Sequence, residues 1–171
     1  MEPNADVALL IRAIEFAARK HRLQRRKDVE ASPYINHPLT LMSVLCVEVG
    51  ICNVEILSVA ALHDTIEETQ TTRDEISREF GKKIADIVAE VTEDKALPTE
   101  ERKRRQIERA PDKSPAAALV TLADKIANLR DVVANPPADW GLEQRQEYFA
   151  GPRLWLISFQ GRIHFCVSYS R

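Results

Sequence analysis

Apolar residues that recur every three or four positions constrain the fold of this chain more than any other feature. Val7, Leu10, Ile11 and Ile14 form one such face near the start, which is the pattern of an amphipathic helix. The same spacing returns along most of the chain, and no alternating strand pattern appears before residue 150. We therefore expect an all-α fold, a helical bundle of about seven or eight helices.

Capping residues indicate where these helices begin. Asn53, the pair Thr72 and Glu75, and Ser114 followed by Pro115 are typical of helix N-termini. After a first helix close to the N-terminus, the pattern predicts helices over residues 38–49, 53–68, 72–80, 82–94, 99–110, 115–135 and 141–149.

The last part of the chain has a different character. The segment GPRLWLISFQGRIHFCVSYSR contains no acidic residue, and its Gly151-Pro152 pair breaks a helix. Ile163, Phe165 and Val167 alternate with polar or small residues, as in a strand, yet nothing upstream offers a sheet. We expect one domain over residues 1–149 and a divergent, loosely packed tail over residues 150–171.

The charge balance limits the classes of partner. The chain has 26 acidic and 24 basic residues and a formal net charge of −2, which argues against nucleic acid or membrane as the main partner. The basic segment 101–109 alternates with glutamates and has no aromatic residues, so we interpret it as a solvated helix face. No apolar run approaches the roughly 18 residues of a membrane span. The start of the sequence does not resemble a signal peptide, and we expect a cytoplasmic protein.

The cysteines give no sign of a structural framework. Cys46, Cys52 and Cys166 are odd in number, and no two of them have the C-x-x-C spacing. We therefore expect three reduced thiols rather than a disulfide framework or a thiolate zinc site.

The segment AALHDTIEET places four titratable residues in an apolar helix. His63 and Asp64 occupy adjacent faces, and Glu67 and Glu68 lie one turn further on, over the same edge. Charges on a packed helix lower stability unless a partner compensates them. A surface pair that caps the helix is one interpretation, and a functional cluster is the other.

Two further residues favour the functional cluster. His37 precedes Pro38 at a junction between loop and helix, and Asp124 lies in the middle of an apolar helix, where an aspartate has poor propensity. Taken alone, each has a structural explanation, as a helix-start residue or as a salt-bridge partner. With His63 and Asp64 they supply two imidazoles and two carboxylates, which suit a divalent first-row metal with open positions. Mn²⁺ fits this oxygen-rich set, and Fe²⁺, Co²⁺ or Zn²⁺ could compete.

An ordered series of motifs resembles one family. The segments HRLQRRKD, PYINHP, AALHDTIEET, EVTEDK, ERKRRQIE, LADKIANLRD and EYF follow one another as in the RelA/SpoT-type HD-domain hydrolases, and most closely as in their short metazoan members. The resemblance covers roughly residues 7–149. It implies an HD-domain helical bundle that binds one Mn²⁺ ion and hydrolyses the 3′-pyrophosphate of (p)ppGpp to GDP or GTP and pyrophosphate.

The resemblance also implies roles for individual residues. It makes His37, His63, Asp64 and Asp124 the metal ligands, and Glu67 and Glu68 the catalytic acid/base pair. It places a further set of residues around the nucleotide substrate: Arg26, Lys27, Tyr34, Lys95, Asn128 and Tyr148.

The chain departs from the family pattern at a few positions. Glu68 stands where the family usually has Asp, and Gln144 stands where it tends to have Arg. Other interpretations therefore stay open. One is an HD-type phosphohydrolase with another substrate, such as the 2′-phosphate of NADPH, and another is a non-catalytic isoform that binds a nucleotide. The sequence does not settle the oligomeric state.

Overall fold

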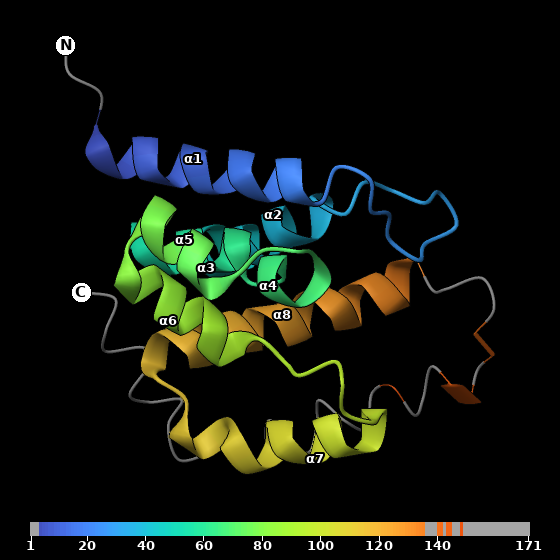
Figure 1. Cartoon of the computed structure of the whole chain (residues 1–171). Coiled ribbons are helices and arrows are strands. Elements are labelled where there is room, and N and C mark those ends of the chain that lie inside the picture. Colours follow the sequence, from blue (N-terminus) through green and yellow to red (C-terminus); the bar gives the residue numbers. More distant parts are fainter. Residues whose placement is uncertain (1–3, 136–139, 142, 145–147, 149–171) are drawn as a thin grey trace.

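The chain folds into a bundle of α-helices. The computed structural model describes residues 4–135, 140, 141, 143, 144 and 148 of the 171-residue chain. Over these residues the only β pairing is an isolated bridge between Arg25 and Pro33. The all-α prediction is thus confirmed (Figure 1). The helices in chain order are α1 (Ala5–Lys20), α2 (Asn36–Ser43), α3 (Val54–Leu62), α4 (Thr65–Glu68), α5 (Arg73–Phe80), α6 (Lys82–Val91), α7 (Thr99–Arg109) and α8 (Pro115–Ala134).

Two short segments extend these helices. The π-helical turn η1 (Val44–Glu48) continues α2, and the 3₁₀ turn η2 (Ala110–Asp112) follows α7. Most of the predicted helix over residues 141–149 and all of the tail over residues 150–171 lie outside the described residues. The division into a domain and a tail therefore stays a prediction.

The predicted N-caps form the expected hydrogen bonds. The Asn53 side chain accepts from the backbone N–H groups of Glu55 and Ile56, and the Ser114 hydroxyl accepts from Ala117. The Thr72 hydroxyl accepts from the Glu75 N–H at 3.1 Å, while the Glu75 carboxylate pairs with Lys20 of α1 at 2.8 Å. Of the pair that predicts a capping box, Thr72 therefore caps α5, whereas Glu75 forms an ion pair that joins α5 to α1.

The central helix of the bundle is α3, which contacts α1, α2, α6 and α8 (Figure 1). Its residues from Leu57 to Leu62 are all buried, and Val120 and Ala123 of α8 are buried as well. Burying apolar groups stabilises the folded state by about 0.8 kcal/mol per methylene group, so these contacts are the main source of stability. A helix that is apolar on every side needs such a central position. The core thereby holds the end of α3 and the middle of α8 at fixed positions.

Two predicted elements differ in detail. The helix expected over residues 53–68 is interrupted at His63 and Asp64, where the chain forms a turn between α3 and the single turn of α4. The helix expected over residues 38–49 begins at Asn36 and widens into η1 before Gly50, whose φ is +78°. Interruptions of this kind are typical of functional segments.

The expectation of reduced thiols is wrong for two of the three cysteines. Cys46 and Cys52 form a disulfide that joins η1 to the segment before α3. The turn at Gly50 brings them together, with a Cα–Cα distance of 4.5 Å. The spacing rule for cysteines did not detect this pair because it considers metal and redox motifs, not turn geometry. Cys166 lies outside the described residues.

Among the described helices, none is both long enough and apolar enough to cross a membrane.

Candidate metal centre and catalytic pocket

Three helices bring the predicted metal ligands to one place. His37 lies in the first turn of α2, His63 follows the last residue of α3, and Asp124 lies in the middle of α8. One potential ligand atom from each of these residues lies within 4.8 Å of the other two. The His37 Nε2 atom is 3.2 Å from Asp124 Oδ1, and His63 Nε2 is 4.0 Å from the same oxygen. Residues far apart in sequence therefore form one cluster.

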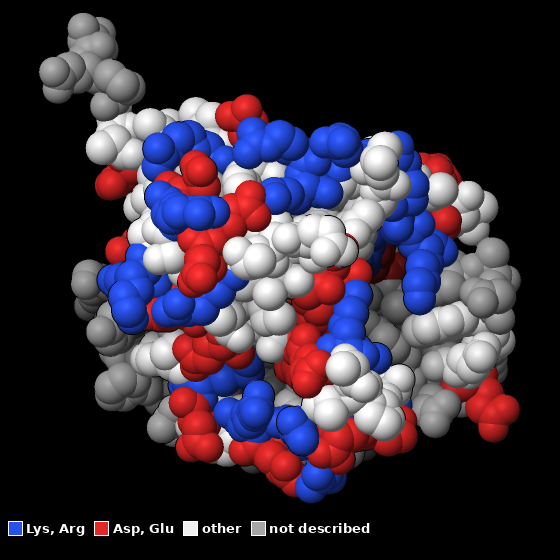
Figure 2. All heavy atoms as spheres, viewed as in Figure 1, with Lys and Arg blue, Asp and Glu red and all other residues white. Residues whose placement is uncertain are grey.

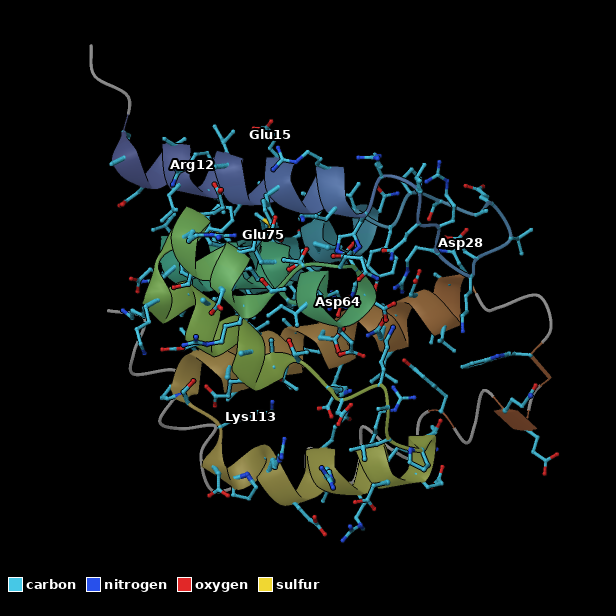
Figure 3. The ribbon with its side chains drawn as sticks, in the orientation of Figure 1. Arg12, Glu15, Asp28, Asp64, Glu75 and Lys113 are labelled. Atoms are coloured by element: carbon cyan, nitrogen blue, oxygen red, sulfur yellow. A yellow bond between two sulfur atoms is a disulfide. The ribbon has the colours of Figure 1, made fainter. Side chains whose placement is uncertain are left out.

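Asp64 completes the cluster from the turn between α3 and α4. Its Oδ2 atom lies 2.9 Å from His63 Nε2 and 3.7 Å from His37 Nε2. The Tyr34 hydroxyl donates a hydrogen bond of 2.6 Å to the same oxygen. Figure 3 shows Asp64 beside α4, above the middle of α8. The interruption of the helix thus places Asp64 on the side of the bundle where His37 and Asp124 lie.

The orientation of His63 suits a metal ligand. Its Nδ1–H donates to the Ala60 carbonyl oxygen at 2.9 Å, so the lone pair of the neutral ring is on Nε2. The Nε2 atom is buried and makes no hydrogen bond with a described residue, although Asp64 is close. Two imidazole nitrogens and the Asp124 carboxylate lie close together, with the Asp64 carboxylate beside the histidines, and such a group is a donor set for a divalent cation. The residues present therefore fit such an ion.

The charges of the cluster also fit a cation. Burial disfavours the charged imidazole of His63, but the Asp64 and Asp124 carboxylates outweigh it and raise the pKa of His63 to about 9. Burial acts against ionisation of Asp64 as well, yet the two histidines and Tyr34 hold the pKa of that carboxyl well below its usual range. The metal-free cluster therefore stabilises positive charge at its centre. A divalent cation would supply that charge and displace the proton.

The two glutamates of α4 have different surroundings. Glu67 is partly buried, and its Oε2 accepts a hydrogen bond from the Glu93 N–H at 3.0 Å. Burial, together with the charges of Asp64 and Glu68, raises the pKa of Glu67. The Glu68 Oε2 atom instead pairs with Lys95 Nζ at 2.5 Å. Carboxyl groups in contrasting environments next to a metal site are suited to proton transfer.

A cavity of about 220 Å³ unites the cluster and the two glutamates. It is lined by the four predicted metal ligands and by a set of further residues from five segments: Arg26, Tyr34, Glu67, Glu68, Val91, Glu93, Gln106, Val120, Thr121, Lys125 and Asn128.

A second cavity, of about 510 Å³, adjoins the first. Arg26, Tyr34, Glu68 and Asn128 line both cavities. Lys27, Lys95, Trp140 and Tyr148 are among the other lining residues of the second one. The six residues that the resemblance placed around the substrate therefore all face this one cavity.

Arg26, which lines both cavities, is held in place by hydrogen bonds. Its Nε donates to Asp131 at 3.1 Å and its Nη2 donates to Asn128 at 3.2 Å. The guanidinium lies 5.7 Å from the centre of the Tyr34 ring. Asn128 in turn donates to Asp124, so Arg26 and this predicted metal ligand share one hydrogen-bond network.

Sequence reasoning missed several residues of the two cavities. Asp131 lies three residues after Asn128, and this spacing on one helix face could have identified it. Gln106 lies on α7, interpreted as a solvated face, and its Oε1 accepts from Lys125 at 3.2 Å. The rest of α7 bears ion pairs such as Glu101 with Arg104, and Figure 2 shows mixed charges over this part of the surface. Nothing in the sequence around Gln106 or Glu93 indicates that these residues line a cavity.

Comparisons with known proteins place the chain in a family. The HD domain model matches residues 13–148. The human guanosine-3′,5′-bis(diphosphate) 3′-pyrophosphohydrolase MESH1 is 52% identical over 158 residues, which are 92% of this chain and 88% of that protein. The Drosophila melanogaster protein of the same name is 43% identical over 90% of this chain and 86% of its own length.

A solved structure agrees with these relatives. It is described as "A metazoan ortholog of SpoT hydrolyzes ppGpp and plays a role in starvation responses". It matches with a TM-score of 0.86 and 39% identity, over 94% of this chain and 89% of that one. An HD domain implies a divalent metal, and the cluster of His37, His63 and Asp124 offers its site. The chain belongs to the HD-domain family and, within it, to the RelA/SpoT-type hydrolases that include the MESH1 proteins.

Proposed function

We propose that this chain is a Mn²⁺-dependent enzyme that hydrolyses the 3′-pyrophosphate of (p)ppGpp and releases GDP or GTP and pyrophosphate. The observation that carries the proposal is that the two cavities adjoin and share four lining residues. The predicted metal ligands and two glutamates line the first cavity, and basic and aromatic side chains line the second. A substrate that carries a reactive pyrophosphate on a nucleoside suits this arrangement, with the pyrophosphate in the first cavity and the nucleoside in the second. The names of the relatives state this activity for those proteins.

We assign the metal-binding role to His37, His63, Asp64 and Asp124. When bound, a divalent cation supplies Lewis acidity toward a phosphate oxygen and lowers the pKa of a coordinated water. The donor atoms of His63, Asp64 and Asp124 are held in place by the Ala60 carbonyl, the Tyr34 hydroxyl and the Asn128 amide, respectively.

We assign proton transfer to Glu67 and Glu68. Water attacks the phosphorus next to the ribose, the bond between that phosphorus and the ribose 3′ oxygen breaks, and the oxygen takes a proton. Glu67, whose pKa is raised by burial, is suited to exchange a proton at this place. Glu68 is the glutamate that lines both cavities and pairs with Lys95.

We assign the second cavity to the nucleotide. Arg26, Lys27 and Lys95 supply positive charge for phosphate groups, and a guanidinium suits bidentate contacts. Tyr34 and Tyr148 offer aromatic surfaces to the base, and Asn128 is placed for contact with the ribose or the base. The partner that this cavity fits is a small nucleotide.

The experiment that tests this function measures products. The purified chain is incubated with Mn²⁺ and ppGpp, and the nucleotides are resolved by ion-exchange chromatography. We expect GDP and pyrophosphate, and we expect Glu67→Gln to lose at least about a hundredfold in turnover while it still binds Mn²⁺. A folded, metal-binding protein that leaves ppGpp intact but releases phosphate from NADPH would overturn the proposal in favour of a 2′-phosphatase.

A further inference from the structure

One buried histidine near the site has no assigned role. His21 follows the last residue of α1 and is 2% exposed. Its Nδ1 lies 2.5 Å from Gln24 Oε1, and its Nε2 has no hydrogen-bond partner among the described residues. Burial lowers the pKa of His21, so the imidazole is neutral at physiological pH. A buried neutral ring with one directed hydrogen bond is suited to hold neighbouring groups in position.

The first connection of His21 runs through Gln24 to the catalytic helix. An amide oxygen accepts hydrogen bonds only, so the His21 Nδ1–H donates to Gln24 Oε1. This orients the amide, and Gln24 Nε2 donates to the backbone carbonyl of Glu68. Glu68 is the last residue of α4, where carbonyl groups have no partner within the helix. The hydrogen-bond chain therefore fixes the end of the single turn that carries Glu67 and Glu68.

The second connection runs through Tyr34 to the cluster of predicted metal ligands. The His21 ring is stacked on the Tyr34 ring, with centroids 4.7 Å apart and an interplanar angle of 21°. The Tyr34 hydroxyl donates to Asp64 Oδ2 at 2.6 Å, and the Tyr34 ring meets His37 edge-on at 6.0 Å. The stack therefore sets the position of a ring that contacts two predicted metal ligands.

We propose that His21 is a positioning residue for both halves of the site. Through Gln24 it holds α4, and with it the two glutamates, and through Tyr34 it holds Asp64 for the cation. This inference rests on the proposed function. A histidine that only fills space in the core would affect stability, without a separate effect on turnover or on metal affinity.

Two substitutions separate the two connections. His21→Phe keeps an aromatic ring against Tyr34 and removes the donor to Gln24. His21→Asn keeps an amide donor at about the place of Nδ1 and removes the ring. We expect His21→Phe to lower kcat about tenfold and leave the Kd for Mn²⁺ within about twofold of the wild type. We expect His21→Asn to weaken Mn²⁺ binding about tenfold, with kcat at saturating Mn²⁺ close to the wild-type value.

The readouts are the Kd for Mn²⁺, from calorimetric titration of the metal-free protein, and kcat at saturating Mn²⁺. Gln24→Leu removes the same hydrogen-bond chain without changing His21, so it should match His21→Phe and replaces it if that variant does not fold. Gln70→Leu is the matched control, because Gln70 is an exposed glutamine close to α4. It should leave both quantities unchanged.

The proposal is overturned if His21→Phe and Gln24→Leu keep the wild-type kcat. It is equally overturned if all His21 variants lower only the melting temperature. Failure of the proposed function is a separate result: the wild type would then leave ppGpp intact. In that case the Kd for Mn²⁺ of His21→Asn still tests the connection to Asp64.

Discussion

At the scale of single residues, the two adjacent carboxyl groups of α4 have different partners. Glu68 pairs with Lys95, whereas Glu67 accepts a hydrogen bond from the backbone N–H of Glu93 and lies near the negative charges of Asp64 and Glu68. When no cation is bound nearby, the burial of Glu67 disfavours the ionised form of its carboxyl group. Such a residue lowers the stability of the metal-free fold, which is a common feature of catalytic groups.

This environment predicts a pH-dependent effect of Glu67→Gln on the stability of the metal-free protein. The raised pKa means that the folded state binds the proton more tightly than the unfolded state. The Glu67 contribution to stability therefore falls as the pH rises from the ordinary glutamate pKa through the raised one. Glutamine does not ionise and still accepts from the Glu93 N–H, so the variant should gain stability relative to the wild type as the pH rises through this window.

Urea unfolding of the metal-free proteins at several pH values measures this difference. A constant difference between Glu67→Gln and the wild type across the window would contradict the raised pKa of Glu67.

The site residues that could be predicted from the sequence are those whose chemical type is unusual for the segment in which they lie. His37 before a proline, His63 and Asp64 within an apolar run, and Asp124 on an apolar helix all lie in the cluster or beside it. Glu93 and Gln106 have ordinary types in polar segments, and only tertiary packing brings them to the cavity. A polar residue in an apolar, buried segment indicates a functional site. A polar residue in a polar segment gives no such indication.

At the scale of elements, the helix starts were predictable and the interruptions were not. Asn53 and Ser114 cap their helices through local hydrogen bonds that depend on a few neighbouring residues. The turn at His63 and Asp64 and the π-helical turn η1 depend instead on contacts with distant helices, since α3 packs on α1 and η1 packs on α8. Local propensity contains no information about such contacts.

The disulfide between Cys46 and Cys52 predicts an effect on stability at this scale. Closing a loop of this short length, with a sequence separation of 6, restricts the unfolded chain and stabilises the fold by about 2 kcal/mol. Cys52→Ser, or reduction with a phosphine, should lower the free energy of unfolding by about that amount. Turnover should stay within about twofold, because the disulfide lies at the opposite end of α3 from His63.

Urea unfolding with and without reductant measures this effect, with Cys52→Ser as the control that reductant should not alter further. Equal stability of the oxidised and reduced wild type would show that the disulfide does not constrain the chain.

At the scale of the whole molecule, the predicted metal-binding cluster joins three separate helices. His37 on α2, His63 after α3 and Asp124 on α8 are held together by the core around α3 (Figure 1). In the metal-free protein these groups place charge in the buried centre of the bundle, which lowers the stability of the fold. A ligand that binds only the folded state adds RT ln(1 + [L]/Kd), about 2.7 kcal/mol at a hundredfold excess over Kd.

Mn²⁺ should therefore raise the melting temperature of the protein by about 5–10 °C at that concentration. Asp124→Ala removes a ligand from the middle of α8 and should abolish most of this shift. Differential scanning calorimetry of both proteins, each with and without Mn²⁺, measures it. An equal shift in Asp124→Ala would place the metal somewhere other than this cluster.

The central claim is that the cluster and the two glutamates form one metal-dependent hydrolytic site. The most direct test is the rate of pyrophosphate release from ppGpp while Mn²⁺ is titrated into the metal-free protein. We predict a rate that is negligible without metal and that saturates when one ion is bound per chain. Pyrophosphate release that is independent of Mn²⁺, or a metal-loaded protein that releases none, would contradict the account.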